Sequence, residues 1–131
     1  MTFVLLVDDM ESFSEPLGYL LRKNGFEVAI CPTGLSALDT FDRCGADIVL
    51  VDLLVRRPPG TEVCRWLRDR SNVPVIALNG RDTEVDRLIG LQQGADDYVT
   101  RPFSWPDLFA RIMAALGSRD QAERSISALA P

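Results

Sequence analysis

Aspartates stand directly after two apolar segments of this chain. Asp8 and Asp9 follow residues 3–7, and Asp52 follows residues 48–51. Three carboxylates that converge on one cleft repel one another, so they need a cation between them. Mg²⁺ takes oxygen ligands, keeps several waters and joins carboxylates to phosphate oxygens. Together the three residues predict a magnesium site that handles phosphate, although each one alone is also a suitable cap for a following helix.

The apolar segments themselves are typical of buried parallel strands. Residues 3–7, 48–51 and 73–78 are rich in Val, Ile and Leu and nearly continuous, as expected of strands that are covered on both faces. Two further segments, at 26–30 and 98–99, complete a set of five. The segment at 26–30 contains Glu27, which suits a strand nearer the edge of the sheet.

Helical spacing of apolar residues fills the gaps between these segments and predicts five helices, the fourth of them ending near Gly94. Alternation of strand and helix implies right-handed crossovers and a parallel sheet with helices on both faces. The predicted fold class is therefore α/β, a doubly wound five-stranded parallel sheet. Ligands of such folds bind at the carboxyl ends of the strands. Asn79 follows the fourth strand and Arg101 follows the fifth, so both are expected at the same edge as the aspartates.

The composition excludes several classes of function. The formal net charge of −5 makes the chain a poor DNA binder by itself. Histidine is absent, which removes His–Cys zinc sites and Ser–His–Asp triads. No apolar run approaches the ~18 residues of a membrane span, and no signal-peptide leader is present, so we expect a cytoplasmic protein without membrane contact. Cys31, Cys44 and Cys64 show no metal-binding spacing and are predicted to be small buried residues.

Four short motifs lie at the ends of the predicted strands and helices. They are Val7-Asp8-Asp9, Val51-Asp52-Leu53, Gly94-Ala95-Asp96-Asp97-Tyr98-Val99 and Arg101-Pro102-Phe103. Their joint spacing resembles the receiver domain of two-component response regulators over residues 3 to about 117. The run from Arg81 through Phe103 is similar to the OmpR/PhoB type, whose members usually carry a C-terminal DNA-binding domain. The resemblance implies a flavodoxin-like receiver fold with strand order 2-1-3-4-5.

The resemblance implies a role for each acidic residue. Asp52 is the phosphoacceptor, whose carboxylate attacks the phosphoryl group of a phosphohistidine on a sensor histidine kinase. Asp8 and Asp9 help to hold Mg²⁺, and Asp52 with the backbone carbonyl of Leu54 completes the protein ligands. The nucleophile then belongs to the protein that is modified. We therefore expect a switch in a phosphorelay and not a turnover enzyme.

Two positions that read the phosphoryl group depart from the family. Thr or Ser usually follows the fourth strand, and here Asn79 offers an amide in place of a hydroxyl. Lys usually precedes the Pro-Phe pair, and here Arg101 keeps the charge but not the compact ammonium. Tyr98 stands at the place of the family's rotating aromatic residue. These three switch residues leave two possibilities open: a slower phosphorylation-driven switch, or a phosphorylation-independent module for constitutive protein interaction and dimerisation.

The loop after Asp52 is also altered. The family typically has Asp-x-x-Leu-Pro-Gly, and this chain has Val55, Arg56 and Arg57 at the last three of these positions, before Pro58-Pro59-Gly60. The two arginines are expected either to pair with the carboxylates of the acidic cleft or to be solvated charges.

A homodimer face is implied on the fourth helix, fifth strand and fifth helix. Such a face is isologous, so each charge pair forms twice. The family's pairs correspond to Arg87 with Asp107 and Asp97 with Arg111. An ordinary solvated face is the alternative. We expect the receiver domain to occupy residues 1–117 and residues 118–131 to be a flexible tail, or the start of a linker to a possible C-terminal DNA-binding domain.

Overall fold

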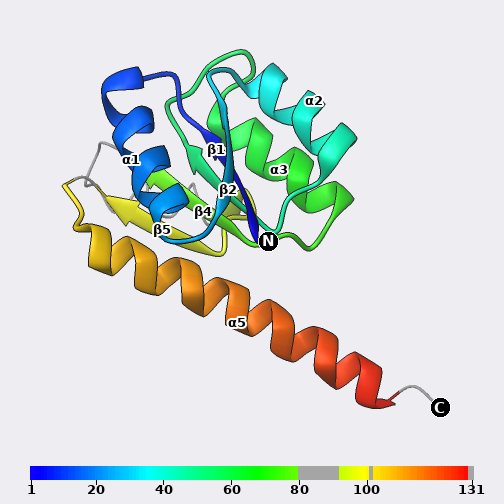
Figure 1. Ribbon diagram of the computed structural model, residues 1–131. Coiled ribbons are helices and arrows are strands. Elements are labelled where there is room, and N and C mark those ends of the chain that lie inside the picture. The colour runs from blue at the N-terminus through cyan, green and yellow to red at the C-terminus, as the bar shows by residue number, and fades with distance from the viewer. Residues whose placement is uncertain (80–91, 101, 130–131) are drawn as a thin grey trace.

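The computed structural model describes residues 1–79, 92–100 and 102–129. Five strands form one parallel sheet in the order β2-β1-β3-β4-β5 (Figure 1), which confirms the predicted doubly wound fold and strand order. The strands are β1 (Phe3–Val7), β2 (Glu27–Cys31), β3 (Ile48–Asp52), β4 (Val75–Asn79) and β5 (Asp97–Thr100).

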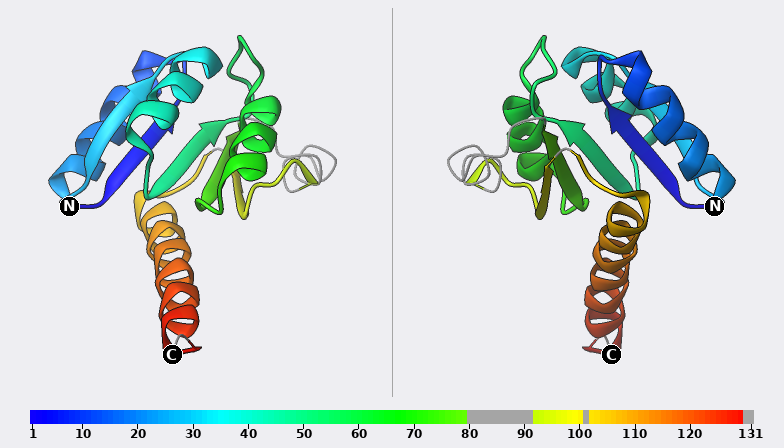
Figure 2. Two further views of the ribbon diagram at one scale, coloured as in Figure 1. Left: turned by 90° about the vertical axis from the view of Figure 1, so that its right-hand side faces the viewer. Right: turned by 90° about the vertical axis from the view of Figure 1, so that its left-hand side faces the viewer.

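Helices cover both faces of this sheet. They are α1 (Glu11–Lys23), α2 (Gly34–Cys44), α3 (Gly60–Arg70) and α5 (Trp105–Leu129). Helices α2 and α3 pack on one face through one buried cluster, and α1 and α5 pack on the other through a second cluster (Figures 1 and 2). The fourth of the five predicted helices falls on residues outside the described part of the chain. None of the described helices is long and apolar enough to cross a membrane.

Successive side chains of a strand point to opposite faces of the sheet, so neighbouring residues of β1 belong to different clusters. Leu5 and Val7 face α2 and α3, whereas Val4 and Leu6 face α1 and α5. All the apolar residues of β3 have an exposed fraction of 0%. A strand that is buried on both faces has no polar side to display, and this is why its sequence is a continuous apolar run.

Helix α5 is longer than expected. The predicted tail begins at residue 118, but the helix continues to Leu129, and its C-terminal half extends beyond the sheet (Figures 1 and 2). Residues 118–129 lack an apolar stripe, so periodicity gave no signal. Half of them are nevertheless Ala, Arg, Glu or Gln, which favour helices. The packed first turns supply the nucleus, and extension by such residues costs little.

The three cysteines differ in their environments. Cys31 and Cys64 are buried as predicted, whereas Cys44, the last residue of α2, is exposed, so that part of the prediction was wrong. Burial raises the pKa of the Cys64 thiol to about 12, and the charge of Arg68 opposes this rise. Burial raises the pKa of Cys31 as well. The reactive species of a cysteine is the thiolate, so both buried thiols are protected twice, by enclosure and by protonation.

Thiol labelling of the native protein should therefore modify Cys44 alone. At about pH 8 an aromatic disulfide reagent is expected to react with one thiol per chain in native buffer and with three after unfolding in guanidinium. Cys44→Ser should abolish the native reaction, and Cys64→Ser should leave it unchanged. Rapid native labelling of Cys64, located by peptide mass, would contradict this assignment.

Candidate functional site

Asp8 and Asp52 lie side by side at the carboxyl edge of the sheet. In the parallel pair of β1 and β3, Val7 aligns with Val51, so the next residue of each strand is an aspartate. Neighbouring strands are about 4.8 Å apart. The exposed fractions are 1% for Asp8 and 4% for Asp52. The structure thus brings these two predicted residues together in a nearly dry environment.

Backbone amides hold both carboxylates in place. The N–H of Met10 donates to Oδ1 of Asp8 at 2.8 Å. In the same way, the N–H of Leu54 donates to Oδ1 of Asp52 at 2.8 Å. Each aspartate therefore accepts a hydrogen bond from the amide two residues later, as in an Asx-turn. Fixing one oxygen sets the plane of the carboxylate, so the orientation of both acids is decided by the backbone.

Asp9 is placed differently from Asp8. Its side chain is exposed, and the chain bends at this residue. Within residues 1–79, 92–100 and 102–129, no group of three or more His, Cys, Asp or Glu side chains is arranged to hold a metal ion. The predicted convergence of three carboxylates is thus seen as a buried pair with Asp9 at the rim. Leu54, whose carbonyl was the fourth expected ligand, is exposed by 48%.

The other switch positions are only partly described. Asn79 ends β4 and aligns with Thr100, and so stands one residue beyond Leu78, the partner of Asp52. Tyr98 is buried with an exposed fraction of 4% and belongs to the cluster beneath α2 and α3. The side chain of Asn79, and all of Arg101 and Arg87, fall outside the described part of the structure.

The loop after β3 returns to the strand from which it starts. The N–H of Val55 donates to the carbonyl of Asp52 at 3.1 Å, and the N–H of Gly60 donates to the carbonyl of Val55 at 3.1 Å. A Cβ atom on Gly60 would lie 2.4 Å from the Asp52 carbonyl oxygen. The first residue of α3 is therefore pressed against the backbone of Asp52, where no side chain fits.

Helix α2 holds the tip of this loop. The N–H of Gly34 donates to the Arg56 carbonyl at 3.1 Å, and that of Leu35 donates to the Arg57 carbonyl at 2.7 Å. Amides that helix α2 cannot satisfy internally are thus satisfied by the loop. Arg56 and Arg57 are exposed, and in the described part of the chain neither guanidinium has an ion pair. Of the two possibilities weighed for them, pairing with the described carboxylates of the cleft is not observed.

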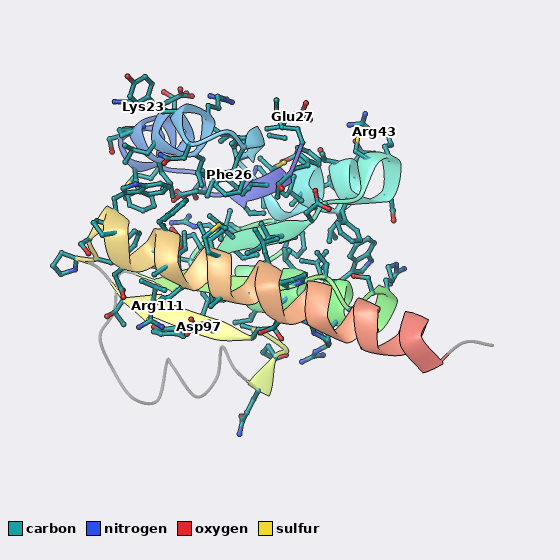
Figure 3. The ribbon with its side chains drawn as sticks, turned by 60° about the horizontal axis from the view of Figure 1, so that its bottom comes forward. Lys23, Phe26, Glu27, Arg43, Asp97 and Arg111 are labelled. Carbon is teal, nitrogen blue, oxygen red and sulfur yellow. The ribbon has the colours of Figure 1, made fainter. Side chains whose placement is uncertain are left out.

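Charges of the expected dimer face pair within one chain. Arg111 Nη1 contacts both carboxylate oxygens of Asp97, at 2.8 and 2.9 Å. The two labelled side chains lie next to each other in Figure 3. The Nε of Arg111 lies 3.2 Å from Oδ2 of Asp107. The hydrogen bond to Asp97 raises the pKa of Arg111, against the opposing effect of burial. The pairing of Asp97 with Arg111 between subunits therefore stays a prediction.

Arg68 on α3 bonds to the segment before β5, a contact that the sequence analysis did not predict. Its guanidinium donates to the Gly94 carbonyl at 3.0 and 2.8 Å and to Asp96 Oδ2 at 2.8 Å. That carboxylate oxygen also accepts the N–H of Val75 at 2.8 Å. Gly94 has a φ of 106°, and a Cβ there would lie 2.9 Å from the Cβ of Arg68. The segment that leads into β5 is thus bonded to α3. In the sequence, the Gly94-Ala95-Asp96 motif was the only feature that pointed to this contact.

A cavity of about 780 Å³ lies away from Asp8, Asp9 and Asp52. Residues from the ends of α2 and α3, the start of β5 and the inner side of α5 line it, among them Phe41, Pro74, Asp96 and Ala114. It belongs to the amino edge of the sheet, so it takes no part in the chemistry of Asp52.

Comparison with known proteins identifies the family. Residues 4–113 match the model of the response regulator receiver domain. The chain therefore belongs to the response regulator receiver family of two-component systems, as the motifs indicated.

Curated relatives agree with this assignment. The chain is 54% identical over 127 residues to the sensory transduction protein RegX3 of Mycobacterium tuberculosis, covering 95% of this chain and 56% of RegX3. It is 44% identical over 115 residues to the transcriptional regulatory protein CseB of Streptomyces coelicolor, covering 88% and 49%. These relatives confirm the OmpR/PhoB type. The chain spans about half the length of the relatives that it matches.

Solved receiver domains have the same fold. The receiver domain of the Francisella response regulator 1452 superposes with a TM-score of 0.85 at 27% identity, covering 91% of this chain and 99% of that one. The BeF3-activated receiver domain of Klebsiella pneumoniae RstA gives a TM-score of 0.85 at 26% identity, covering 88% and 98%.

Gly60→Ala should disturb the loop beside Asp52. The added methyl group meets backbone at 2.4 Å, and backbone cannot rotate away. We expect a loss of about 1–3 kcal/mol in the free energy of unfolding in urea. Gly117→Ala is the matched control, because nothing lies within 4 Å of its added methyl and alanine favours a helix by about 1 kcal/mol. Equal stability of the two variants would contradict the close approach.

Proposed function

We propose that this receiver domain accepts a phosphoryl group on Asp52 from a phosphohistidine of a sensor kinase in the cytoplasm. The proposal rests on one observation above all. A buried carboxylate, oriented by the amide of Leu54, ends a central strand directly beside a second buried carboxylate, Asp8. Family membership makes a kinase the expected partner.

The transfer is a displacement at phosphorus. An oxygen of Asp52 forms the new P–O bond as the P–N bond of the phosphohistidine breaks. The electron pair of that bond stays on the imidazole nitrogen, which takes up a proton. Asp52 needs no activation beyond ionisation, so its surroundings contribute position and charge. The product remains attached to the chain, and the domain is a carrier of the signal and not a turnover enzyme.

The residues at this edge fit Mg²⁺. The ion needs one or two protein carboxylates, and it fills its remaining positions with waters and phosphate oxygens. Asp8, Asp9, Asp52 and the backbone carbonyl of Leu54 would hold it. Bound there, Mg²⁺ would offset negative charge on the transferring group and its acceptor.

Three further residues would read the modification. Asn79 would donate its amide to a phosphoryl oxygen, and Arg101 would contact the same group through its guanidinium. Tyr98, already buried in the sheet cluster, would respond to the movement of the loop after β4. In this proposal the altered residue types slow the switch but leave the capture of the phosphoryl group intact.

The output would be dimerisation through the face that holds β5 and α5, together with the expected fourth helix. RegX3 and CseB extend well beyond the matched region, and CseB is named as a transcriptional regulatory protein. DNA binding would then belong to a separate C-terminal domain, because the acidic chain described here repels phosphate.

Phosphorylation is tested by intact mass. Incubation with Mg²⁺ and acetyl phosphate or phosphoramidate should add one phosphoryl group, and Asp52→Ala should abolish the gain. Removal of Mg²⁺ by a chelator should also abolish it. Asp47→Ala, which alters an aspartate at the opposite end of β3, is the control and should leave the gain unchanged. No gain with any donor would contradict the proposal and favour the phosphorylation-independent module.

Dimerisation is tested by reversing one charge. Arg111→Glu places a carboxylate between Asp97 and Asp107, its present partners at 2.8 and 3.2 Å. We expect the phosphorylated protein to change from dimer to monomer, as measured by light scattering. Arg43→Glu makes the same charge change at an exposed pair with Asp39 on α2, and should leave the dimer intact. An unchanged mass of the Arg111 variant would contradict the assigned face.

A further inference from the structure

The tip of the loop after β3 presents two cations that the proposed function does not use. Arg56 and Arg57 are exposed and without an ion pair among the described residues. They stand at the edge of the sheet that carries Asp8, Asp9 and Asp52. The chain as a whole has a net charge of −5, so these neighbouring positive charges oppose the sign of their surroundings.

The backbone that carries them is held on several sides. Both arginine carbonyls accept N–H groups from the start of α2. Pro58 packs so closely against Gly34 that a Cβ there would lie 2.4 Å from the Pro58 carbonyl oxygen. Two consecutive prolines limit the loop further, since each fixes its own φ. The arginine side chains therefore extend from a preorganised base, and binding through them would cost little ordering of the backbone.

Arg57 has an unusual backbone conformation. Its φ is 61°, in the left-handed region that glycine adopts readily and other residues rarely do. A side chain at such a position is held against the preference of its own backbone. Backbone outliers of this kind gather at functional sites, which directs attention to what the side chain contacts.

The backbone at Arg56 lies close to Asp52. The hydrogen bond from Val55 N–H to the Asp52 carbonyl makes a turn, and the ends of such a turn lie within about 7 Å of each other. Each further residue adds at most about 3.8 Å between Cα atoms. The Cα of Arg56 is thus within about 11 Å of that of Asp52, close to the Debye length of about 10 Å at 0.1 M salt.

We propose that Arg56 and Arg57 form an anion-binding pair that captures the phosphoryl group of the incoming donor before its transfer to Asp52. The inference rests on the proposed function and names the ligand class, an anionic phosphoryl group on a small acyl phosphate or on a phosphohistidine. Such a group must approach an edge with three carboxylates, which repel it. Guanidinium groups match phosphate oxygens in geometry and charge, and they raise the local concentration of anions.

The first experiment compares phosphorylation rates. The double variant Arg56→Ala/Arg57→Gly should lower the second-order rate constant by about three- to tenfold at low ionic strength. The difference should nearly vanish at about 1 M salt, where the Debye length is about 3 Å. Acetyl phosphate and phosphoimidazole serve as donors, since one represents acyl phosphates and the other phosphohistidine. A loss with one donor alone assigns the pair to that source.

The matched control removes two positive charges at the opposite edge. Arg22→Ala/Lys23→Ala changes the end of α1 and should lower the rate by less than about twofold. An equal loss in both double variants would show that net charge alone matters and would overturn the proposal. Arg57→Gly by itself should not lower the melting temperature, because glycine suits a φ of 61°. A slower reaction of this variant is then not a consequence of misfolding.

A second readout separates this inference from the proposed function. In the Asp52→Asn background no transfer takes place, and NMR titration with acetyl phosphate in Mg²⁺ reports binding alone. The dissociation constant should rise about three- to tenfold when both arginines are also replaced. An unchanged constant overturns the arginine pair even where Asp52 is phosphorylated. A wild-type protein that binds through the arginines but never gains a phosphoryl group would overturn only the proposed acceptor role.

Discussion

The burial of two like charges side by side is the constraint on which this edge of the molecule depends. Asp52 ends β3, Asp8 directly follows the neighbouring strand β1, and both are almost inaccessible to solvent. Desolvation disfavours each carboxylate, and each disfavours ionisation of the other. The amides of Met10 and Leu54 offset part of this cost. A cation bound at these carboxylates, as proposed, would offset more of it.

The loop after β3 also helps to fix the Asp52 carboxylate in place. It must leave Asp52, allow the Leu54 amide to turn back onto the carboxylate, and return so closely that only glycine fits at position 60. The start of α2 then fixes the tip through two amide hydrogen bonds. The placement of the Asp52 carboxylate and that of the backbone at Arg56 and Arg57 thus have one structural origin.

Local sequence patterns predicted the buried strands and the residues at their carboxyl ends. The continuous apolar run of β3 exists because both faces are covered, and an aspartate after such a strand must lie at the carboxyl edge. Properties that depend on distant contacts were not predictable in this way. The exposure of Cys44 and the bonds between Arg68 and Gly94 depend on how helices meet segments far away in sequence. The length of α5 depends on residue propensity without any apolar stripe.

The ion pairs on α5 limit what charge alone can contribute to assembly. Arg111 is already paired with Asp97 and Asp107 within its own chain, and its side chain is about one-third exposed. An isologous interface that paired Arg111 with Asp97 of a second copy would exchange one ion pair for an equivalent one. The net gain from partly exposed pairs is about 0–1 kcal/mol each. In the proposed dimer, charges on this face would therefore set the register of the two copies. The driving force would come from apolar contact, for which exposed Met113 on the same helix is available.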